Sequence, residues 1–438
     1  MENPGYARRI NLMDAALIVV GGIIGGGIFL NPGIAAQRTS SGWELLALWV
    51  AAGLLTLVGC LCYSELGARR PQAGGSYVYL REAFGRVAGF LFGWTMLLVI
   101  YSGSAAAVAT IFGTYATSVF GLPEHLVKPL AVGALVFVTG INLFGIKLGA
   151  RIQNVFAILK LVAIAVLVVT GLAFAGAGTT QALAGSAAPV ADGNIAGALL
   201  PVLFAFSGFS YLNNLAGEVR DPQRTLPRAL VLGMLVVIAA YVLTNYAYLA
   251  VLGHAGLAAS NAPAADVMSR VFGSAGAKII AIGIAISTLG FCNITLVAGA
   301  RVLQVMGEDG LFFASVARLH PVHRTPNVAL VALSLWAIFL VFAANYGQLL
   351  DFATFGDWAA YAVTIATLFW YRRHVKERPS FVTPAYPLLP LVFLATVIAV
   401  VVAYAWSKPL SAAVVCAVVL AGLPVYAVWR RLFSKVAR

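Results

Sequence analysis

The sequence predicts an all-α integral membrane protein with twelve spanning helices, ten of which form two inverted repeats of five. The first observation is composition, since 61% of the 438 residues are hydrophobic and 10% are charged, whereas a soluble domain carries about 25% charged residues. The second is a series of twelve apolar segments that are long enough to cross a bilayer. The third is a pair of helix-breaking stretches in the first and sixth of these segments.

Each span needs about 20 apolar residues to cross the roughly 30 Å hydrocarbon core. Segments of about this length lie near residues 12–37, 43–67, 87–119, 127–145, 153–174, 196–216, 227–252, 277–305, 327–344, 348–371, 386–406 and 410–429. We expect residues 12–174 and 196–371 to be the two five-helix repeats and residues 386–429 to supply two additional helices. Residues 1–11 and 430–438 are then the terminal segments.

The basic residues divide unequally between the two sides of the predicted helices. Of 28 Lys and Arg residues, 22 fall on the side of the two termini, five fall on the opposite side and Lys160 lies within a span. Because positive residues are enriched in cytoplasmic loops, we predict cytoplasmic termini and a location in the inner (cytoplasmic) membrane. Membrane topology therefore explains the net charge of +13, and nucleic acid is not an expected partner.

The first helix-breaking stretch, Gly21–Phe29, has glycine at five of its first seven positions. Each glycine in a helix interior costs roughly 0.8–1 kcal/mol relative to alanine, so we predict that the helix is interrupted. Non-helical backbone at membrane depth is tolerated only where it is buried in protein or lines a cavity, and the interruption therefore predicts a site. The N–H groups of Gly26, Gly27 and Ile28 would face an anion such as a carboxylate, and carbonyls near Ile23 would face an ammonium.

A packing motif is the alternative for this stretch. Gly21 and Gly25 have the spacing of small residues at which two membrane helices approach closely. Such a motif needs only two small residues, however, and the additional glycines favour an interrupted helix with a binding site.

The second stretch, Phe204–Asn214, places Ser-Gly between aromatic residues, followed by Ser, Tyr and two Asn. These small and polar residues are poor helix formers, and polar residues at membrane depth are typically functional. Interruptions at corresponding positions of two five-helix halves indicate an inverted repeat with a binding site near the midplane. A serine-rich packing face is the alternative, but the pairing with the first stretch favours a site.

Lys160 is the one Lys or Arg well inside a predicted span, where a charge costs about 2.5–3.5 kcal/mol on insertion scales. We expect its side chain to face the interior of the bundle. It could bind and release a proton as its environment changes, or its ammonium could replace a bound sodium ion at the carbonyls of the first interruption. Snorkelling to the cytoplasmic interface, roughly 10 Å away at helical rise, is the structural alternative.

Asp357 is the other ionisable residue expected within a span. Its carboxylate could contact the side chain of a substrate, or it could pair locally near the outer end of its helix. The sequence favours neither alternative.

Cysteine and histidine give no sign of a metal site, a catalytic group or a cofactor. The four cysteines lie within apolar runs, at positions 60, 62, 292 and 416. His254 is expected in a solvated outer loop, and the histidines at 320, 323 and 374 in inner loops. A membrane enzyme would need a catalytic constellation that these positions do not provide.

Four motifs lie in order along spans one to nine. They are Gly22–Phe29, Cys62–Gly67 followed by Gly74–Leu80, Phe204–Asn214 followed by Glu218–Pro227, and Arg301–Gly310 with Thr325-Pro326. Together they resemble the amino acid–polyamine–organocation (APC) superfamily of transporters, most closely its bacterial members similar to the L-type amino acid transporters. Their joint occurrence is far more specific than any single glycine cluster.

This resemblance implies the leucine-transporter-like fold, with two inverted five-helix repeats and two additional helices. It implies that backbone N–H groups of Gly25–Ile28, chiefly Gly26 and Gly27, meet the substrate carboxylate. The substrate amino group would meet carbonyls near Ile23 and in the second stretch. The second-stretch site residues are Phe204 at a gating position, Ala205, Phe206, Ser207 and Tyr211. Lys160 matches a lysine that occupies the sodium position of sodium-coupled relatives.

Three positions depart from the family pattern. Gly26 replaces a serine, Phe209 stands where tryptophan is common, and Asp357 stands where L-type members tend to have asparagine. The carboxylate of Asp357 leaves the charge preference for substrate side chains open. The loop between spans three and four has no cysteine of the kind that tethers a second subunit in animal L-type members, so no obligatory heavy subunit is expected.

We therefore expect a sodium-independent transporter of small neutral L-amino acids, an exchanger or a facilitator, that works by alternating access. Proton-coupled symport through Lys160 and cationic amino acid or polyamine transport through Asp357 are the alternatives. A channel would need a continuous polar stripe, whereas polar residues here gather at two interruptions. The expected partners are an amino acid substrate and the lipid bilayer.

Overall fold

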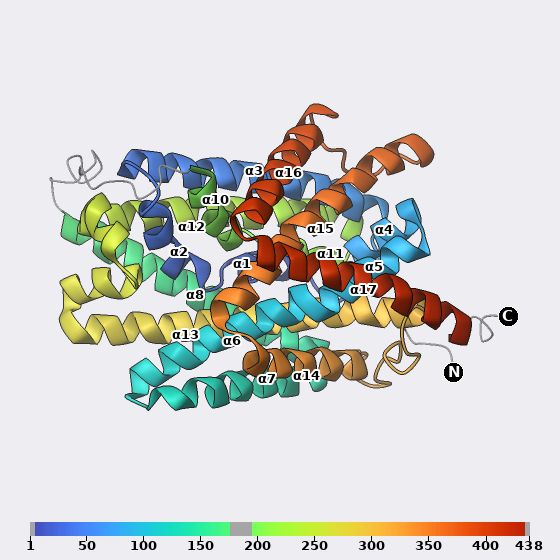
Figure 1. Ribbon diagram of the computed structural model, residues 1–438, viewed down its shortest axis with the longest axis horizontal. Coiled ribbons are helices and arrows are strands. Elements are labelled where there is room, and N and C mark those ends of the chain that lie inside the picture. Colours follow the sequence, from blue (N-terminus) through green and yellow to red (C-terminus); the bar gives the residue numbers. More distant parts are fainter. Residues whose placement is uncertain (1–4, 176–194, 434–438) are drawn as a thin grey trace.

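The computed structural model describes residues 5–175 and 195–433, and helices dominate this part of the chain (Figure 1). The first range contains α1 (Leu12–Ile23), α2 (Gly27–Ala36), α3 (Gly42–Arg69), α4 (Ser76–Phe84), α5 (Arg86–Thr95), the π-helix η1 (Met96–Ile100), α6 (Tyr101–Phe120), η2 (Glu124–Leu126), α7 (Val127–Leu143) and α8 (Ile146–Ala175). The second contains α10 (Ile195–Ala205), α11 (Tyr211–Asn214), η4 (Ala216–Glu218), α12 (Pro222–Ala259), α13 (Pro263–Glu308), α14 (Asn327–Ala343), α15 (Tyr346–His374), α16 (Leu388–Ser407) and α17 (Pro409–Phe433). Parts of the predicted terminal segments, 1–4 and 434–438, lie outside the described residues.

The prediction of an all-helical, multi-pass membrane protein is confirmed for the described chain. Within residues 5–175 and 195–433, nine helices are long and apolar enough to cross a membrane, and α1 with α2 forms a tenth candidate bent by 44°. The apolar α14 has 17 residues, and the sixth predicted segment is divided between α10 and α11. Every predicted apolar segment therefore overlaps a described helix.

Side chains in the sequence set several helix starts. Asn11 Oδ1 accepts from the Asp14 N–H at 2.9 Å, and Asp14 Oδ2 accepts from the Asn11 N–H at 3.2 Å, which is a reciprocal capping box at α1. Asn345 and Gln348 form the same box at α15, and Ser41 caps α3. These contacts satisfy N–H groups that the first turn of a helix leaves without partners.

Two glycines bend helices that extend beyond the predicted segments. Gly253 in α12 has φ +67° and Gly273 in α13 has φ +62°, left-handed conformations that glycine adopts without strain. The prediction of a solvated loop at His254 is wrong, because its side chain is 5% exposed and its Nε2 lies 3.1 Å from Thr39 Oγ1. After Gly253 the chain continues as helix and packs against the segment that follows α2.

The interrupted segments lie in the interior of the bundle (Figure 1). The half-helix α1 packs against α8, α12 and α13, and α2 packs against α10, α12 and α13. The short α11 contacts both α1 and α13. By contrast, α16 and α17 are the least buried of the long apolar helices, and they pack on the outside against α3, α5 and α15. The packing therefore gathers the two predicted breaks where non-helical backbone is shielded from lipid.

Candidate functional site

The first interruption lies between α1, which ends at Ile23, and α2, which begins at Gly27. The predicted break is therefore present. The N–H groups of Gly26, Gly27 and Ile28 make no hydrogen bond with any described residue, and Gly26 has no side chain with which to cap α2. These donors and the positive end of the α2 dipole are available to an anion.

Neighbouring side chains press directly against these glycines. A Cβ at Gly26 would lie 2.7 Å from Ile111 Cδ1, and a Cβ at Gly25 would lie 3.0 Å from Phe291 Cδ2. The serine that the family pattern places at position 26 would therefore require the Ile111 side chain to move. The absence of side chains lets Ile111 on α6 and Phe291 on α13 lie close to the interrupted backbone.

The second interruption separates α10, which ends at Ala205, from α11, which begins at Tyr211. Gly208 has φ +95°, a conformation that other residues rarely adopt. A Cβ at Gly208 would lie 2.1 Å from the carbonyl oxygen of Gly22, and a Cβ at Gly27 would lie 3.1 Å from the Cα of Ala205. The two interruptions are thus in direct backbone contact and form one site.

Lys160 projects from α8 to the end of α1. Its side chain is fully buried, and its Nζ donates to the carbonyl of Gly21 at 3.0 Å and to that of Ile24 at 2.5 Å. The snorkelling alternative is therefore wrong. These carbonyls belong to the C-terminal end of α1, where the helix dipole favours a cation, and the contacts are compatible with a proton carrier and with a fixed cation.

Three hydroxyl groups donate to the remaining carbonyls of the site, and sequence reasoning missed them. The Tyr241 hydroxyl on α12 donates to Ala205 O at 2.9 Å and reaches Ile23 O at 3.3 Å, so it joins the two interruptions. The Tyr248 hydroxyl contacts Ile28 O at 3.3 Å, and Ser287 contacts Gly25 O at 3.4 Å. In the sequence, these three residues are marked only by a polar side chain within an apolar segment. Such residues are too common in this chain for that feature to single out a site.

Asp357 lies in the middle of α15, not near the outer end of its helix. Its side chain is 5% exposed, and its Oδ2 accepts a hydrogen bond from the Tyr361 hydroxyl at 2.8 Å. The same hydroxyl oxygen accepts the N–H of Gly208 at 2.9 Å. Asp357 is therefore linked to the second interruption through one tyrosine. This hydrogen bond to a residue one turn away on the same helix is also the local pairing that was one of the two alternatives for Asp357.

The other residues predicted in the second stretch divide into two groups. The ring of Phe206 packs against those of Trp49 on α3 and Tyr241 on α12, with centroid distances of 5.8 Å and 5.0 Å. Tyr211 faces the first interruption, because a Cβ at Gly22 would lie 3.3 Å from its ring. Between α10 and α11, Ser207 Oγ donates to the carbonyl of Phe204 at 2.6 Å. The side chain of Phe204 is half-buried. Tyr211 thus packs against the first interruption, whereas Phe206 packs against α3 and α12.

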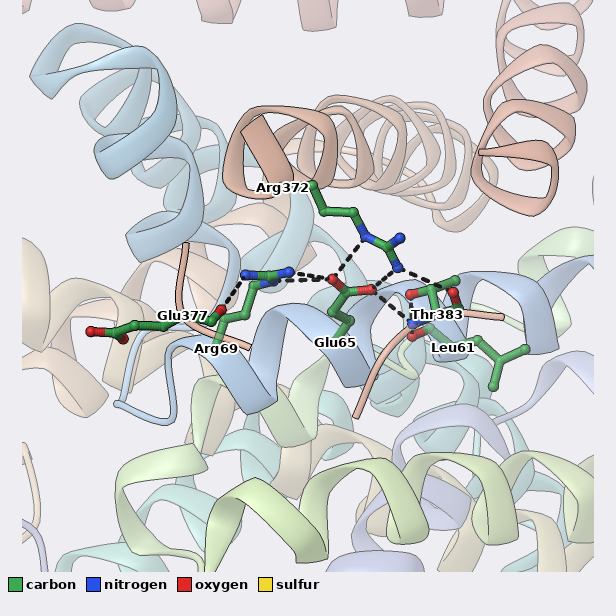
Figure 2. A network of polar contacts seen from close by, with 6 residues as sticks. All are labelled: Leu61, Glu65, Arg69, Arg372, Glu377 and Thr383. Atoms are coloured by element: carbon green, nitrogen blue, oxygen red, sulfur yellow. Dashed lines mark hydrogen bonds and ion pairs between the residues drawn. The ribbon is translucent and has the colours of Figure 1, made fainter. Parts of the chain in front are cut away.

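A second polar cluster lies at the ends of α3 and α15 that we predict to be cytoplasmic (Figure 2). Glu65 is fully buried, and its carboxylate accepts hydrogen bonds from Arg69 at 2.8 Å and from Arg372 at 2.6 Å. It also accepts the N–H of Thr383 at 2.8 Å. We call these four residues the Glu65 network. It ties α3 to α15 and to the segment that leads into α16.

Further ion pairs lie near the same end of the bundle, and they join Arg70 to Glu82, Arg81 to Asp309 and Arg301 to Glu218. Sequence analysis assigned none of these contacts. A signal was nevertheless present, because Glu65, Glu218, Arg301 and Asp309 all fall within the four motifs. Part of the motif pattern therefore reflects structural ion pairs and not substrate contacts.

Comparisons with known proteins agree with this arrangement. A family model described as amino acid permease matches residues 10–425. The chain is 31% identical over 429 residues to the serine/threonine exchanger SteT of Bacillus subtilis (strain 168), covering 97% of each chain. It is 32% identical over 397 residues to the b(0,+)-type amino acid transporter 1 of Mus musculus, covering 89% of this chain and 81% of the relative. It is also 32% identical over 432 residues to the large neutral amino acids transporter small subunit 2 of Mus musculus, covering 96% and 80%.

These matches include both interruptions, Lys160, Asp357 and the Glu65 network, since they extend over nearly the whole chain. The matching proteins are membrane transporters and not enzymes, and amino acids are the substrates that their names share. The chain therefore belongs to the amino acid permease family, within the APC superfamily of amino acid transporters.

Proposed function

We propose that this protein is a sodium-independent transporter of small neutral L-amino acids, which it exchanges or facilitates by alternating access. It works in the inner (cytoplasmic) membrane with both termini in the cytoplasm. The observation that carries the proposal is the direct contact of two helix interruptions beside N–H groups that have no partner among the described residues.

The site offers complementary groups to a zwitterion. The α-carboxylate of a substrate binds the N–H groups of Gly26, Gly27 and Ile28, where the α2 dipole adds to the attraction. The α-ammonium binds carbonyls near Ile23 and in the Phe204–Ser207 turn. A carbonyl oxygen accepts two hydrogen bonds, so the Tyr241 contact leaves Ile23 and the turn able to accept an ammonium.

A small, neutral side chain fits the walls of this site best. Ile111 and Phe291 already approach the first interruption within van der Waals distance, and Tyr211 packs against Gly22. Bulky apolar walls close to the backbone leave little room beyond the Cα of a bound amino acid. Such walls also penalise a charged side chain that finds no partner.

The buried ammonium of Lys160 supports sodium independence. It already donates to two carbonyls of α1 that would otherwise be free to coordinate a cation. A sodium ion at the same carbonyls would place two unit charges within a few ångströms of each other in a dry interior, where their repulsion is large.

We further propose twelve spans, with residues 12–174 and 196–371 as inverted repeats and residues 386–429 as two additional helices. The support is the position of the interruptions, since each lies in the first span of its repeat and both meet at one site. The asymmetry of Lys and Arg supports the cytoplasmic termini.

We also propose that the protein works without a heavy subunit. The loop between α6 and α7, residues 121–126, contains no cysteine that could tether a second chain.

Counterflow in proteoliposomes tests the proposal. Vesicles preloaded with each of the twenty amino acids are tested for uptake of labelled serine, threonine and alanine, with and without external sodium. We expect saturable uptake that internal small neutral amino acids accelerate and that sodium leaves unchanged. Uptake that is neither saturable nor stimulated from the opposite side would overturn the proposal, as would a requirement for sodium.

Proton-coupled symport is the second candidate, because Lys160 is a buried amine in contact with the site. An inward proton gradient would then accelerate uptake in the wild type and not in Lys160→Ala. If the gradient leaves both proteins unaffected, proton coupling through Lys160 is excluded.

Transport of cationic amino acids or polyamines is the third candidate. It is favoured by the buried Asp357, which forms no ion pair within the described chain and is one tyrosine away from the second interruption. Arginine or a diamine would then compete with alanine, and Asp357→Asn would abolish the competition. Failure of both cations to compete with alanine would exclude this candidate.

A further inference from the structure

An apolar cavity of about 550 Å³ lies between α5, η1, α15 and α17, apart from the interruptions. Its walls include Leu91 and Met96, Ala359 and Val363, and Val415 and Cys416. The lining holds no charged residue, and its one hydroxyl, Thr95, donates to the carbonyl of Leu91 at 2.8 Å. The volume is in the range of ligand sites in proteins, about 300–1,000 Å³.

The cavity follows from how α17 packs. Trp94 Nε1 on α5 donates to Val418 O at 2.9 Å, and a Cβ at Gly422 would lie 2.7 Å from Leu91 Cδ2, so α17 is held tightly against α5. Toward α15, the lining combines the small residues Gly356, Ala359 and Ala360 with Phe355 and Val363. The three small residues have too few side-chain atoms to fill the space between the helices.

Water does not suit this space. A buried water needs two to four polar partners, and the only hydroxyl of the lining is already bonded. Several lining residues, among them Val363, Cys416 and Leu420, are exposed on the surface that faces lipid. An empty crevice would forfeit dispersion contacts on both walls, so a hydrocarbon chain from the bilayer is the favourable occupant.

The depth of the cavity matches one leaflet. Its lining extends from Ala88 to Ile100, which is about 18 Å along the helix at 1.5 Å per residue. Half of the hydrocarbon core is about 15 Å thick. The length of the cavity is therefore close to that of a phospholipid acyl chain in one leaflet.

Three exposed arginines, Arg86, Arg430 and Arg431, lie at the first turn of α5 and the last turn of α17, the two helices that line one side of the cavity. Arg86 begins α5 and donates to Asp309 O at 2.9 Å, while Trp429 on α17 donates to the adjacent Gly310 O at 3.0 Å. Arg86 and Trp429 therefore bind consecutive residues of one turn, and Arg430 and Arg431 follow Trp429 in the last turn of α17.

In Figure 1, α17 runs beside α5 toward the end of the molecule at which the C-terminus lies. No ion pair joins the three arginines to a described carboxylate, and the nearby acids Asp309 and Glu82 are paired with Arg81 and Arg70. Basic residues between helices at the cytoplasmic surface are typical of sites for anionic headgroups.

We propose that this cavity binds an acyl chain of an anionic phospholipid from the cytoplasmic leaflet, with its phosphate held by Arg86, Arg430 and Arg431. The bound chain completes the contact between α17 and α15 next to Gly356, which lines the cavity and precedes Asp357 in the sequence. The lipid site rests on the orientation proposed above and is independent of which amino acid is transported.

Labelling of Cys416 tests occupancy. This is the one exposed cysteine of the four in the chain, and its reaction with N-ethylmaleimide is followed by mass spectrometry of the purified full-length protein in detergent. Dioleoylphosphatidylglycerol should slow the reaction at least about ten-fold, and dioleoylphosphatidylcholine should slow it much less. Equal protection by the two lipids, or protection by neither, would overturn the proposal.

Two variants separate the cavity from the headgroup site. Ala359→Phe fills the cavity and should remove the protection by phosphatidylglycerol, whereas Ala413→Phe, exposed on α17 outside the lining, should retain it. The double variant Arg430→Gln/Arg431→Gln should reduce the preference for phosphatidylglycerol at least about five-fold, with Arg373→Gln as the exposed control. If a higher protein concentration slows the labelling of Cys416 and added lipid does not, the surface around Cys416 is an interface between copies of this chain, and the proposal fails.

Discussion

Replacing Glu65 by glutamine tests whether the Glu65 network holds together the ends of α3 and α15 that we predict to be cytoplasmic. The carboxylate accepts five hydrogen bonds, two from Arg69, two from Arg372 and one from the N–H of Thr383. Glutamine preserves the side-chain volume and removes the charge. It leaves the two guanidinium groups close together without the counter-ion that they share.

The expected cost follows from burial. Removing one partner of a buried ion pair costs about 3–5 kcal/mol, but the Arg372 side chain is 19% exposed and water screens part of the interaction. We therefore expect Glu65→Gln to lower the free energy of unfolding by about 2–3 kcal/mol. This corresponds to a shift of roughly 30- to 150-fold in the unfolding equilibrium.

Unfolding by sodium dodecyl sulfate in mixed micelles measures this change. A double-mutant cycle of Glu65→Gln and Arg372→Gln isolates their coupling, which we expect to be about 1.5–3 kcal/mol. Arg373→Gln on the same helix, an exposed arginine, serves as the control and should change the free energy by less than about 0.5 kcal/mol. A coupling below about 0.5 kcal/mol would show that the network does not stabilise the junction of α3 and α15.

Three further substitutions address the candidate site. Gly208→Ala should abolish counterflow, because the φ of Gly208 is +95° and the new Cβ would lie 2.1 Å from Gly22 O. The control is Gly121→Ala, at a glycine with φ +63° and open space around it, which should lower the free energy of unfolding by only about 1–2 kcal/mol and keep transport. Lys160→Met removes the donor from two carbonyls at the end of α1, so we expect the rate of exchange to fall at least about 100-fold. Gel filtration should show that the variant still assembles, and a near-normal rate of exchange would contradict the role given to the ammonium. Tyr361→Phe removes the hydroxyl between Asp357 and the Gly208 N–H, and the unpaired groups should raise KM about five- to 100-fold; a KM within two-fold of wild type would refute the link.

The positions of the helices and of their interruptions were determined largely by the sequence itself. A membrane helix satisfies its own backbone, so the length and polarity of a segment decide whether it spans, with little reference to its neighbours. Glycine propensity is also a local property. The breaks within Gly21–Phe29 and within Phe204–Asn214 could therefore be predicted before any packing was known.

The bends at Gly253 in α12 and at Gly273 in α13 could not be predicted in the same way. Glycine is compatible with both a helix and a left-handed turn, so only the packing of the flanking residues selects between them. His254 was placed in a solvated loop for this reason, although its side chain is buried beside Thr39.

Only the tertiary structure decided which groups meet at the site. The Tyr241 hydroxyl donates to Ala205 O on another element, the Gly208 N–H is bonded by Tyr361 on α15, and Glu65 pairs with Arg372 more than 300 residues away. Nothing local marks these tyrosines among the 16 in the chain. Hydrogen bonds form over about 3 Å, so their partners depend on how distant helices cross. Hydrophobic length and helix propensity are summed along the chain and can be read without knowing the fold.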